Sequence, residues 1–261
     1  MAKAKIPEPP HLLADLKTLY LSTMAAQWRQ IAEEAKSKRL PHAEYLAQLA
    51  HLEVTGRRER RIQRRIKDAR FPMLKTLDAF NFDAQPGLDR DEVLELFGCE
   101  FIEKAANVVL VGGVGTGKTH IAIALGMACC QNDYRVRFTT AAELTNMLVE
   151  AKSQDRLSRK LEQLARFDVV AIDELGYVPF DKQGADLLFG FITRVYERRS
   201  LIVTTNLPFA KWSEVFLDAT AAAAVIDRIV HHATVLKTEG DSYRLRTATR
   251  QRRRRAAAKS S

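Results

Sequence analysis

Residues 112–119 read Gly-Gly-Val-Gly-Thr-Gly-Lys-Thr, a glycine-rich segment that closes with a lysine and a hydroxyl residue. Residues 107–111 before it are typical of a buried strand, and residues 121–130 after it are typical of a helix. Glycines at a tight strand-to-helix turn let backbone N–H groups point inward around a phosphate, and the helix N-terminus adds partial positive charge. The segment therefore predicts a phosphate-binding loop in an α/β domain.

Two side chains of the predicted loop have specific tasks. Lys118 is expected to reach the β and γ phosphates of a nucleoside triphosphate, and the Thr119 hydroxyl is expected to ligate Mg²⁺. The predicted cofactors are therefore ATP and Mg²⁺. The residues expected to surround the phosphates are Gly112, Gly113, Val114, Gly115, Thr116, Gly117, Lys118, Thr119 and His120.

Two acidic residues follow a second apolar run. Asp173 and Glu174 come directly after the four apolar residues 169–172, and Asp173 lies 55 residues after Lys118. We expect Asp173 to hold Mg²⁺ and Glu174 to position and polarise an attacking water.

A polar residue also follows the apolar run 201–205. Asn206 is expected to lie near the γ-phosphate at the end of a neighbouring strand, with Thr205 as a second candidate. The alternative is an asparagine that only caps the strand before Leu207 and Pro208.

Short apolar runs alternate with helical patterns from residue 107 onward. This alternation predicts a five-stranded parallel sheet covered by helices on both faces. The expected strands are 108–111, 136–138, 169–172, 201–205 and 235–237.

The N-terminal part of the chain is expected to form a small all-helical module. Apolar residues recur at three- and four-residue spacing from Leu13 to Ile31, which predicts one amphipathic helix that Pro41 interrupts. A second helical pattern continues through an arginine-rich stretch until Phe71-Pro72. The predicted organisation is a helical domain at 1–70, an ATPase domain at 71–245 and a basic tail at 246–261.

The net charge of +9 is concentrated in two segments. Residues 57–70 carry +6 and residues 244–259 carry +8, so the rest of the chain is net −5. Localised positive charge indicates a polyanionic partner such as nucleic acid, although a solvated helix face and a disordered tail are the alternatives. The sequence shows no aromatic-rich platform for single strands, so duplex DNA is the expected partner, contacted through its phosphates.

Cysteine content and hydropathy bear on the compartment. Three cysteines, two of them adjacent at Cys129 and Cys130, give no disulfide framework and are expected to be buried small residues. The N-terminus has no signal-peptide pattern and no run is long enough to span a bilayer, so we expect a cytoplasmic protein without membrane contact.

Several motifs together resemble the IstB family of insertion-sequence ATP-binding proteins, which are AAA+ ATPases related to the DnaC helicase loaders. The resemblance covers nearly the whole chain. The segments that carry it are 112–119, 173–177, 204–209 with Trp212, Asp227-Arg228, His231-His232 and 240–245.

The resemblance implies a bacterial, nucleoid-associated helper of DNA transposition. Members of this family bind DNA with ATP, assemble into multimers on it and help a partner transposase select or engage its target. We therefore expect a homo-oligomer on duplex DNA, a partner transposase, and a P-loop NTPase of AAA+ architecture.

The resemblance also assigns two candidate catalytic residues. Asn206 matches sensor 1, and Arg228 falls where the family places the arginine finger of a neighbouring subunit. From the residues alone, an ion pair within the helix is the alternative for Arg228. Only 33 residues follow Arg228, too few for the usual helical lid, so no sensor-2 arginine is assigned, and Arg244 is a candidate.

Two other functions share part of this pattern. A helicase loader would have the same nucleotide-site residues and a different partner. A small-molecule P-loop kinase would transfer the phosphoryl group to a metabolite, and its basic segments would be incidental. The Glu174 carboxylate after the strand and the absence of an obvious substrate lid favour hydrolysis.

Overall fold

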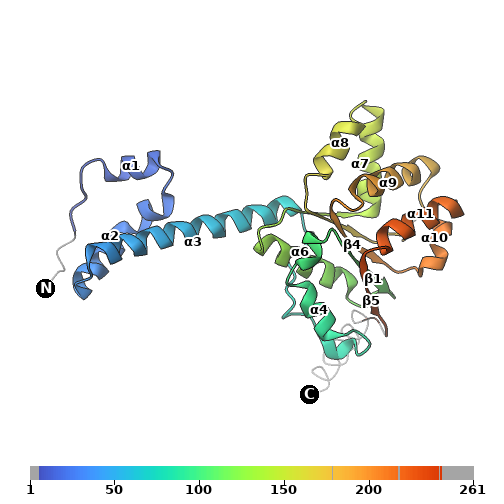
Figure 1. Ribbon diagram of the computed structural model, residues 1–261, viewed down its shortest axis with the longest axis horizontal. Helices are drawn as coiled ribbons and strands as arrows, with labels where there is room; N and C mark the ends of the chain where they lie inside the picture. The colour runs from blue at the N-terminus through green and yellow to red at the C-terminus, as the bar shows by residue number, and fades with distance from the viewer. Residues whose placement is uncertain (1–5, 178, 217, 241, 243–261) are drawn as a thin grey trace, which may run out of the picture. The chain divides into compact units, whose positions relative to one another are not determined.

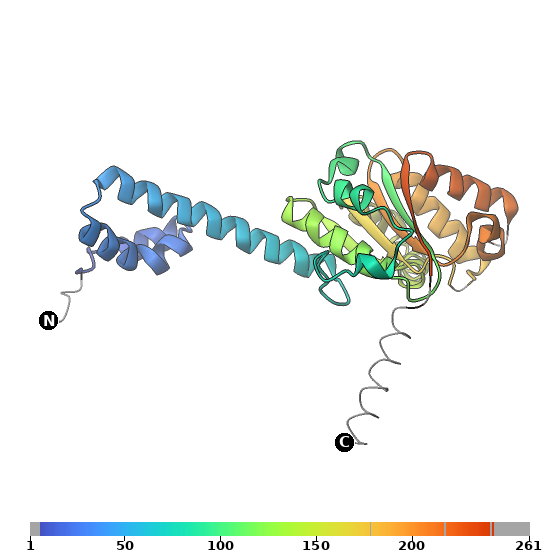
Figure 2. The same cartoon turned by 90° about the horizontal axis from the view of Figure 1, so that it is seen from below.

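The computed structural model describes residues 6–177, 179–216, 218–240 and 242. The chain divides into two compact units, Met1–Arg64 and Arg65–Ser261, and Figures 1 and 2 show their helices and strands. Arg244 and the basic tail predicted at 246–261 lie outside the described residues.

A five-stranded parallel sheet forms the centre of the second unit, which confirms the predicted α/β fold. Its strands are β1 (Asn107–Gly112), β2 (Val136–Thr140), β3 (Val169–Asp173), β4 (Ser200–Thr205) and β5 (Ala233–Thr238). Their order across the sheet is β2-β3-β4-β1-β5. Because every pairing is parallel, the carboxyl ends of the strands meet at one edge. A ligand is expected in the crevice at that edge.

Two layers of helices cover the sheet (Figure 2), because side chains alternate between the faces of each strand. Along β3, Val170 and Ile172 enter one hydrophobic core, whereas Val169 and Ala171 enter the other. The first core packs against α7 (Ala141–Ser153), α8 (Leu157–Leu164), α9 (Lys182–Val195), α10 (Trp212–Phe216) and α11 (Ala219–Val230). The second packs against α4 (Arg90–Leu96), α5 (Glu100–Glu103) and α6 (Lys118–Gln131). Two 3-10 turns, η1 (Phe82–Ala84) and η2 (Phe209–Lys211), lie in the connections.

All three cysteines are free and buried, as predicted. The Sγ atoms of Cys99 and Cys129 lie 3.7 Å apart in the second core. Burial raises the pKa of Cys130 to about 12, so this thiol stays protonated near neutral pH. A protonated thiol is a poor nucleophile, and Cys130 therefore serves as a small core residue.

The first unit is helical, as predicted, but its first helix is broken. It contains α1 (Leu12–Thr18), α2 (Ser22–Lys38) and most of α3 (His42–Ala69). The prediction of one helix from Leu13 to Ile31 is wrong, because Tyr20 adopts a left-handed φ of 56°. The N–H of Leu21 then donates to the Leu16 carbonyl at 2.8 Å, which closes α1 in the manner of a Schellman motif. None of the described helices is both long and apolar enough to cross a membrane.

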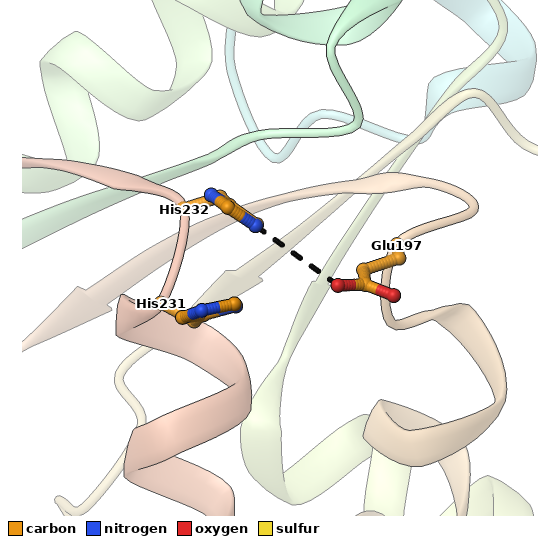
Figure 3. Close-up of side chains that lie close together, drawn as sticks. All are labelled: Glu197, His231 and His232. Carbon is orange, nitrogen blue, oxygen red and sulfur yellow. Dashed lines mark ion pairs between the residues drawn. The ribbon is translucent and has the colours of Figure 1, made fainter.

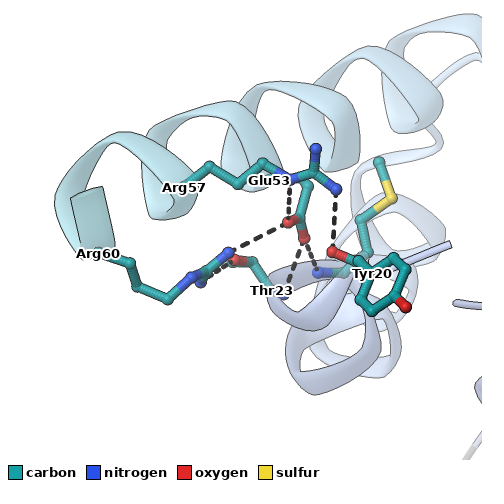
Figure 4. Close-up of polar contacts among 6 residues, drawn as sticks. Tyr20, Thr23, Glu53, Arg57 and Arg60 are labelled. Carbon is teal, nitrogen blue, oxygen red and sulfur yellow. Dashed lines mark hydrogen bonds and ion pairs between the residues drawn. The ribbon is translucent and has the colours of Figure 1, made fainter. Parts of the chain in front are cut away.

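A carboxylate from α3 explains why α2 begins where it does (Figure 4). The Glu53 side chain is 3% exposed and accepts hydrogen bonds from the backbone N–H groups of Thr23 and Met24 at 2.7 and 3.0 Å. Arg57 Nε and Arg60 Nη2 donate to the same carboxylate at 3.0 and 3.2 Å. Glu53 thus caps α2 from 30 residues away, and it uses two arginines of the basic segment to balance its charge.

The hydrogen bonds of Glu53 also determine its ionisation. Burial acts to raise the pKa of this carboxyl group, but the Met24 N–H and the Arg57 guanidinium together outweigh burial and lower it. A lowered folded-state pKa means that this stabilisation is present at pH values above the ordinary pKa of a glutamate. The stabilisation is lost as the pH falls through the folded-state pKa.

We predict that Glu53→Gln lowers the free energy of local opening of α2 by about 1–3 kcal/mol, because charge-assisted hydrogen bonds become neutral ones. Hydrogen exchange of the α2 amides near neutral pH measures this quantity. Glu59→Gln, which changes an exposed glutamate of the same helix, is the matched control. Equal protection of α2 in the two variants would contradict the capping role of Glu53.

Candidate functional site

The glycine-rich loop joins β1 to α6 at the carboxyl edge of the sheet, and glycine is required where other chain segments approach it. A Cβ atom on Gly112 would lie 2.0 Å from the Thr238 carbonyl oxygen at the end of β5. Gly117 has a left-handed φ of 97°, and a Cβ there would lie 2.6 Å from the Phe80 ring. The loop is therefore held between β5 and the segment that precedes α4, with no room for side chains at these two positions.

Lys118 lies across the mouth of the loop. Its Nζ atom donates to the carbonyl oxygens of Gly112 and Gly113 at 2.7 and 2.6 Å, and the residue is 9% exposed. Thr116 supports the same turn, because its hydroxyl donates to the Gly113 carbonyl at 2.8 Å. The loop thus combines a helix N-terminus with a largely buried ammonium group, which is the electrostatic requirement for binding an anion.

Asp173 joins the loop to two neighbouring strands. The Thr119 hydroxyl, in the first turn of α6, donates to both carboxylate oxygens of Asp173 at 3.0 and 3.1 Å. The Thr204 hydroxyl on β4 donates to Asp173 Oδ1 from the other side. The fold therefore brings the predicted pair of Thr119 and Asp173 together at the edge where the strands end. Asp173 is almost fully buried there, with 5% of its surface exposed.

Glu174 and Asn206 extend from the same edge. Glu174 has a left-handed φ of 60°, its N–H donates to Thr204 Oγ1 at 3.0 Å, and its side chain is exposed. Asn206 follows β4, which lies between β3 and β1. The Asn206 Oδ1 atom is buried and has no hydrogen-bond partner among the described residues. A buried amide oxygen without a partner at this edge is a free polar group for a ligand or a water.

Two other predicted residues have structural contacts. The Thr205 hydroxyl accepts a hydrogen bond from the Leu207 N–H at 3.1 Å, which forms a turn after β4. His120 Nε2 lies 2.8 Å from the Thr76 carbonyl oxygen, and its ring packs edge-on against Phe80 at 5.4 Å. His120 therefore fastens the segment before η1 to the start of α6.

Arg228 lies near the end of α11, beside the amino end of β1 and thus opposite the carboxyl ends of the strands. Its carbonyl oxygen accepts a 3.3 Å hydrogen bond from Asn107 Nδ2, at the first residue of β1. Its guanidinium group donates to the Ala224 carbonyl at 2.9 Å and lies 5.1 Å from the Phe189 ring centroid. No carboxylate lies within ion-pair distance of Arg228 in the described part of the chain, so the ion pair considered within the helix is not formed.

Polar contacts anchor the end of α11 just beyond Arg228 (Figure 3). His232 Nε2 is 3.9 Å from Glu197 Oε1 in the turn before β4, an ion pair when the histidine is protonated. The Tyr196 hydroxyl lies 2.8 Å from His231 Nδ1. Both histidines are therefore tied to the α9–β4 turn, which fixes the direction in which α11 ends.

Three residues of the site were missed by the sequence reading. Thr204 lies within an expected strand, yet its hydroxyl links Asp173 to the Glu174 backbone. Thr238 ends β5 with its hydroxyl 2.7 Å from the Thr116 hydroxyl. Asn107 begins β1 and binds the end of α11 through its side-chain amide. A polar residue inside an otherwise apolar strand is the signal that could have revealed Thr204 and Asn107.

The parallel sheet of order β2-β3-β4-β1-β5, with the glycine-rich loop after its fourth strand in that order and Asp173 on β3, defines a P-loop protein of the AAA+ class. Solved structures show the same fold. The replication initiator DnaA bound to AMPPCP and single-stranded DNA matches with a TM-score of 0.53 at 19% identity, over 64% of this chain and 50% of that one. DnaI matches with a TM-score of 0.51 at 18% identity, over 64% and 89% of the two chains.

The chain belongs to the family of IstB-like ATP binding proteins, whose family model matches residues 14–251. The ATP-binding protein assigned to insertion sequence IS21 of Pseudomonas aeruginosa is 42% identical over 90% of this chain and 88% of its own length. Its counterpart in insertion sequence IS5376 of Geobacillus stearothermophilus is 38% identical over 87% and 91% of the two chains. The expected family is therefore confirmed, and with it an ATP-binding protein of the insertion-sequence type.

The Thr204 hydroxyl generates a prediction about stability. Thr204→Val should lower the free energy of unfolding of the α/β unit by about 1–3 kcal/mol, because a buried carboxylate oxygen and the Glu174 N–H each lose a partner. Urea unfolding followed by Trp212 fluorescence in a Trp28→Phe background reports on this unit, since the chain has two tryptophans. Thr204→Ser keeps the hydroxyl and should retain most of the stability. Valine and serine variants of equal stability would show that the hydroxyl contributes nothing.

Proposed function

We propose that this chain hydrolyses ATP, binds duplex DNA, assembles into homo-oligomers on it and assists a partner transposase in target selection. The observation that carries the proposal is the position of Arg228, which is remote from the P-loop of its own chain. Family membership supports the setting, because the relatives are ATP-binding proteins of insertion sequences.

The position of Arg228 favours action between subunits. The strands β1 and β5 are in register from Asn107 opposite Ala233 to Gly112 opposite Thr238. Arg228 is bound to Asn107 at one end of β1, and the P-loop follows the other end. Five residues of strand correspond to about 16 Å, which exceeds the reach of an arginine side chain. Arg228 would therefore complete the site of a neighbouring copy, and each site would be complete only in an assembly.

The residues of the site fit a magnesium ion. In an octahedron with metal–oxygen distances of about 2.0–2.1 Å, adjacent ligand atoms lie about 2.9 Å apart. The Thr119 hydroxyl and the nearer Asp173 oxygen are 3.0 Å apart, and hydroxyl and carboxylate oxygens are ligands that Mg²⁺ prefers. Thr119 and Asp173 would hold Mg²⁺, which when bound neutralises charge on the β and γ phosphates.

Hydrolysis assigns a role to each remaining side chain. The loop N–H groups and Lys118 would bind the phosphates, and Lys118 would exchange its two carbonyl contacts for phosphate oxygens. Glu174 would accept a proton from the attacking water, since its carboxylate is exposed beside Asp173. The free Asn206 Oδ1 atom would orient that water or the γ-phosphate. Arg228 of the neighbouring copy would stabilise the charge that develops during transfer.

The proposed binding of DNA and of a transposase is based on the basic segments of the chain and on its family. Residues 57–70 carry +6, and the N-terminal helical region is the proposed surface for the transposase or DNA. The basic tail at 246–261 is the second proposed DNA contact. A helicase loader would share the nucleotide site, but the insertion-sequence relatives favour transposition. A small-molecule kinase would not need Arg228 at the far edge of the sheet.

Glu174→Gln is the direct test of hydrolysis. We expect this variant to bind ATP like the parent and to release phosphate at least about 100-fold more slowly, because the amide cannot accept the proton of the attacking water. Calorimetry measures ATP binding, and phosphate release with added duplex measures turnover. Lys118→Ala should lose ATP binding itself, and Glu95→Gln at an exposed position of α4 is the matched control. Turnover at the parent rate in Glu174→Gln would remove this residue from its proposed role.

Mixing two inactive variants tests the role of Arg228 between subunits. Arg228→Ala keeps an intact P-loop but no finger, whereas Glu174→Gln keeps the finger but cannot activate water. We expect the mixture to regain ATPase activity that neither variant shows alone, because Arg228 of one copy completes the site of the other. Phosphate release measured across mixing ratios gives the answer. Absence of any recovery at every ratio would contradict completion of the site between subunits.

A further inference from the structure

A group of basic side chains lines one groove of the α/β unit, at the β2 edge of the sheet. The groove has a volume of about 370 Å³. Its cations come from the end of α3, from β2 and its preceding residue, and from α8 and the turn after it. They are Arg70, Arg135, Arg137, Lys160 and Arg166.

None of these five cations has a carboxylate within ion-pair distance among the residues that the structure describes. Arginines elsewhere in the same unit do have such partners, as Arg65 has Asp133 at 3.0 Å. The acid that acts on Arg137 is Glu143, whose carboxylate is already engaged with the Thr140 backbone in a capping box. The positive charge of the groove is thus left without a partner of its own.

The free protein pays an electrostatic cost for this arrangement. Burial, followed by repulsion from Arg70, lowers the pKa of Arg137. Both effects disfavour the guanidinium charge, and both are relieved when an anion enters the groove. The half-burial of Arg137 and the repulsion from Arg70, which lines the same groove, therefore favour an anionic ligand there.

The basic surface continues beyond the first groove. A second cavity of about 390 Å³ shares Met147, Lys160 and Gln163 with it and adds Arg156 and Arg159 beside one acid, Glu150. The two cavities run along α8, whose eight residues correspond to a length of about 12 Å. Duplex DNA rises about 3.4 Å along its axis per nucleotide of a strand, so that length corresponds to three to four base pairs measured along the axis. An extended row of phosphates uses this surface better than one small anion does.

We propose that the groove lined by Arg70, Arg135, Arg137, Lys160 and Arg166 binds the phosphate backbone of duplex DNA. The proposal rests on the DNA-binding function proposed above and places a contact within the ATPase unit itself. Met147, Leu164 and Phe167 give the groove an apolar floor, on which deoxyribose can pack while the cations contact phosphates. Such contacts fix the position of DNA without reading its sequence.

Arg135→Gln/Arg166→Gln in the full-length protein is the test, since both side chains are exposed. With ATP and Mg²⁺, binding of a fluorescent duplex is measured by anisotropy over a series of salt concentrations. We expect weaker binding and a slope of log K against log salt that is smaller by about 1.8, because each lost phosphate contact removes about 0.9. The matched control is Lys104→Gln/Lys237→Gln, which removes two exposed charges away from the β2 edge and should keep the parent slope.

The outcomes separate the groove from the overall function. A parent protein that binds no duplex with or without ATP refutes the proposed function and the groove together. A parent that binds duplex while the groove variant keeps its affinity and slope refutes the groove alone. The second part of the experiment measures the binding of inorganic pyrophosphate to both proteins. If it binds the parent more tightly than the groove variant while both bind duplex equally, the groove is a small-anion site and its assignment to DNA is overturned.

Arg137→Gln distinguishes binding from a structural role. Removal of a repelled guanidinium should raise the melting temperature of the free protein and reduce the increase in melting temperature that duplex produces. A variant that melts lower than the parent and gains the full increase with duplex would show that Arg137 serves the fold instead of DNA.

Discussion

The carboxylate of Asp173 is the junction on which the site depends. It ends β3, accepts hydrogen bonds from Thr119 on α6 and from Thr204 on β4, and is almost fully buried. A buried charge is stable only when its hydrogen bonds are satisfied, so these contacts fix the spacing of three elements at once. The P-loop, the proposed metal ligands and Glu174 take their positions from this spacing, because the Glu174 N–H is bound to the same Thr204 hydroxyl. Parallel pairing of the strands makes the junction available, since it brings all carboxyl ends to one edge.

Much of this edge could be predicted from the sequence because its determinants are local. A strand, a glycine-rich turn and a helix start are written in consecutive residues, and Asp173 and Asn206 each follow an apolar run. The contacts that were missed join residues far apart in the chain. Glu53 begins α2 from 30 residues away, so the periodicity of residues 13–31 shows one helix where the structure has two. Thr204 and Thr238 likewise acquire their partners only when the sheet forms, so a threonine within an apolar strand is a local signal that does not identify its partner.

β1 connects the P-loop to the proposed arginine finger, Arg228. Asn107, at its first residue, binds the carbonyls of Arg228 and Ile229, while its last residue opens the P-loop. The same asparagine accepts the N–H of Leu201 on β4, so it also holds the neighbouring strand. A rigid strand between a P-loop and an arginine presented to another subunit would transmit a shift at the subunit contact to the nucleotide. Assembly and nucleotide state would then influence each other without a separate lever domain, as linkage requires of any two coupled sites.

The distribution of charge changes the meaning of the basic composition. Two arginines of the 57–70 segment are bound to Glu53 and one to Asp133, so counting charges along the sequence overstates what this helix offers to DNA. The groove at the β2 edge differs in both respects from this segment. Apart from Arg70, its cations come from segments with ordinary charge, and the fold brings them together without acids. Unpaired cations lose less hydration and no ion pair when they meet phosphates, and for this reason they are the stronger candidates for backbone contacts. Under the proposed function, DNA held beside the sheet would sense a subunit arrangement that depends on ATP, and a contact through the helical region alone would not require this.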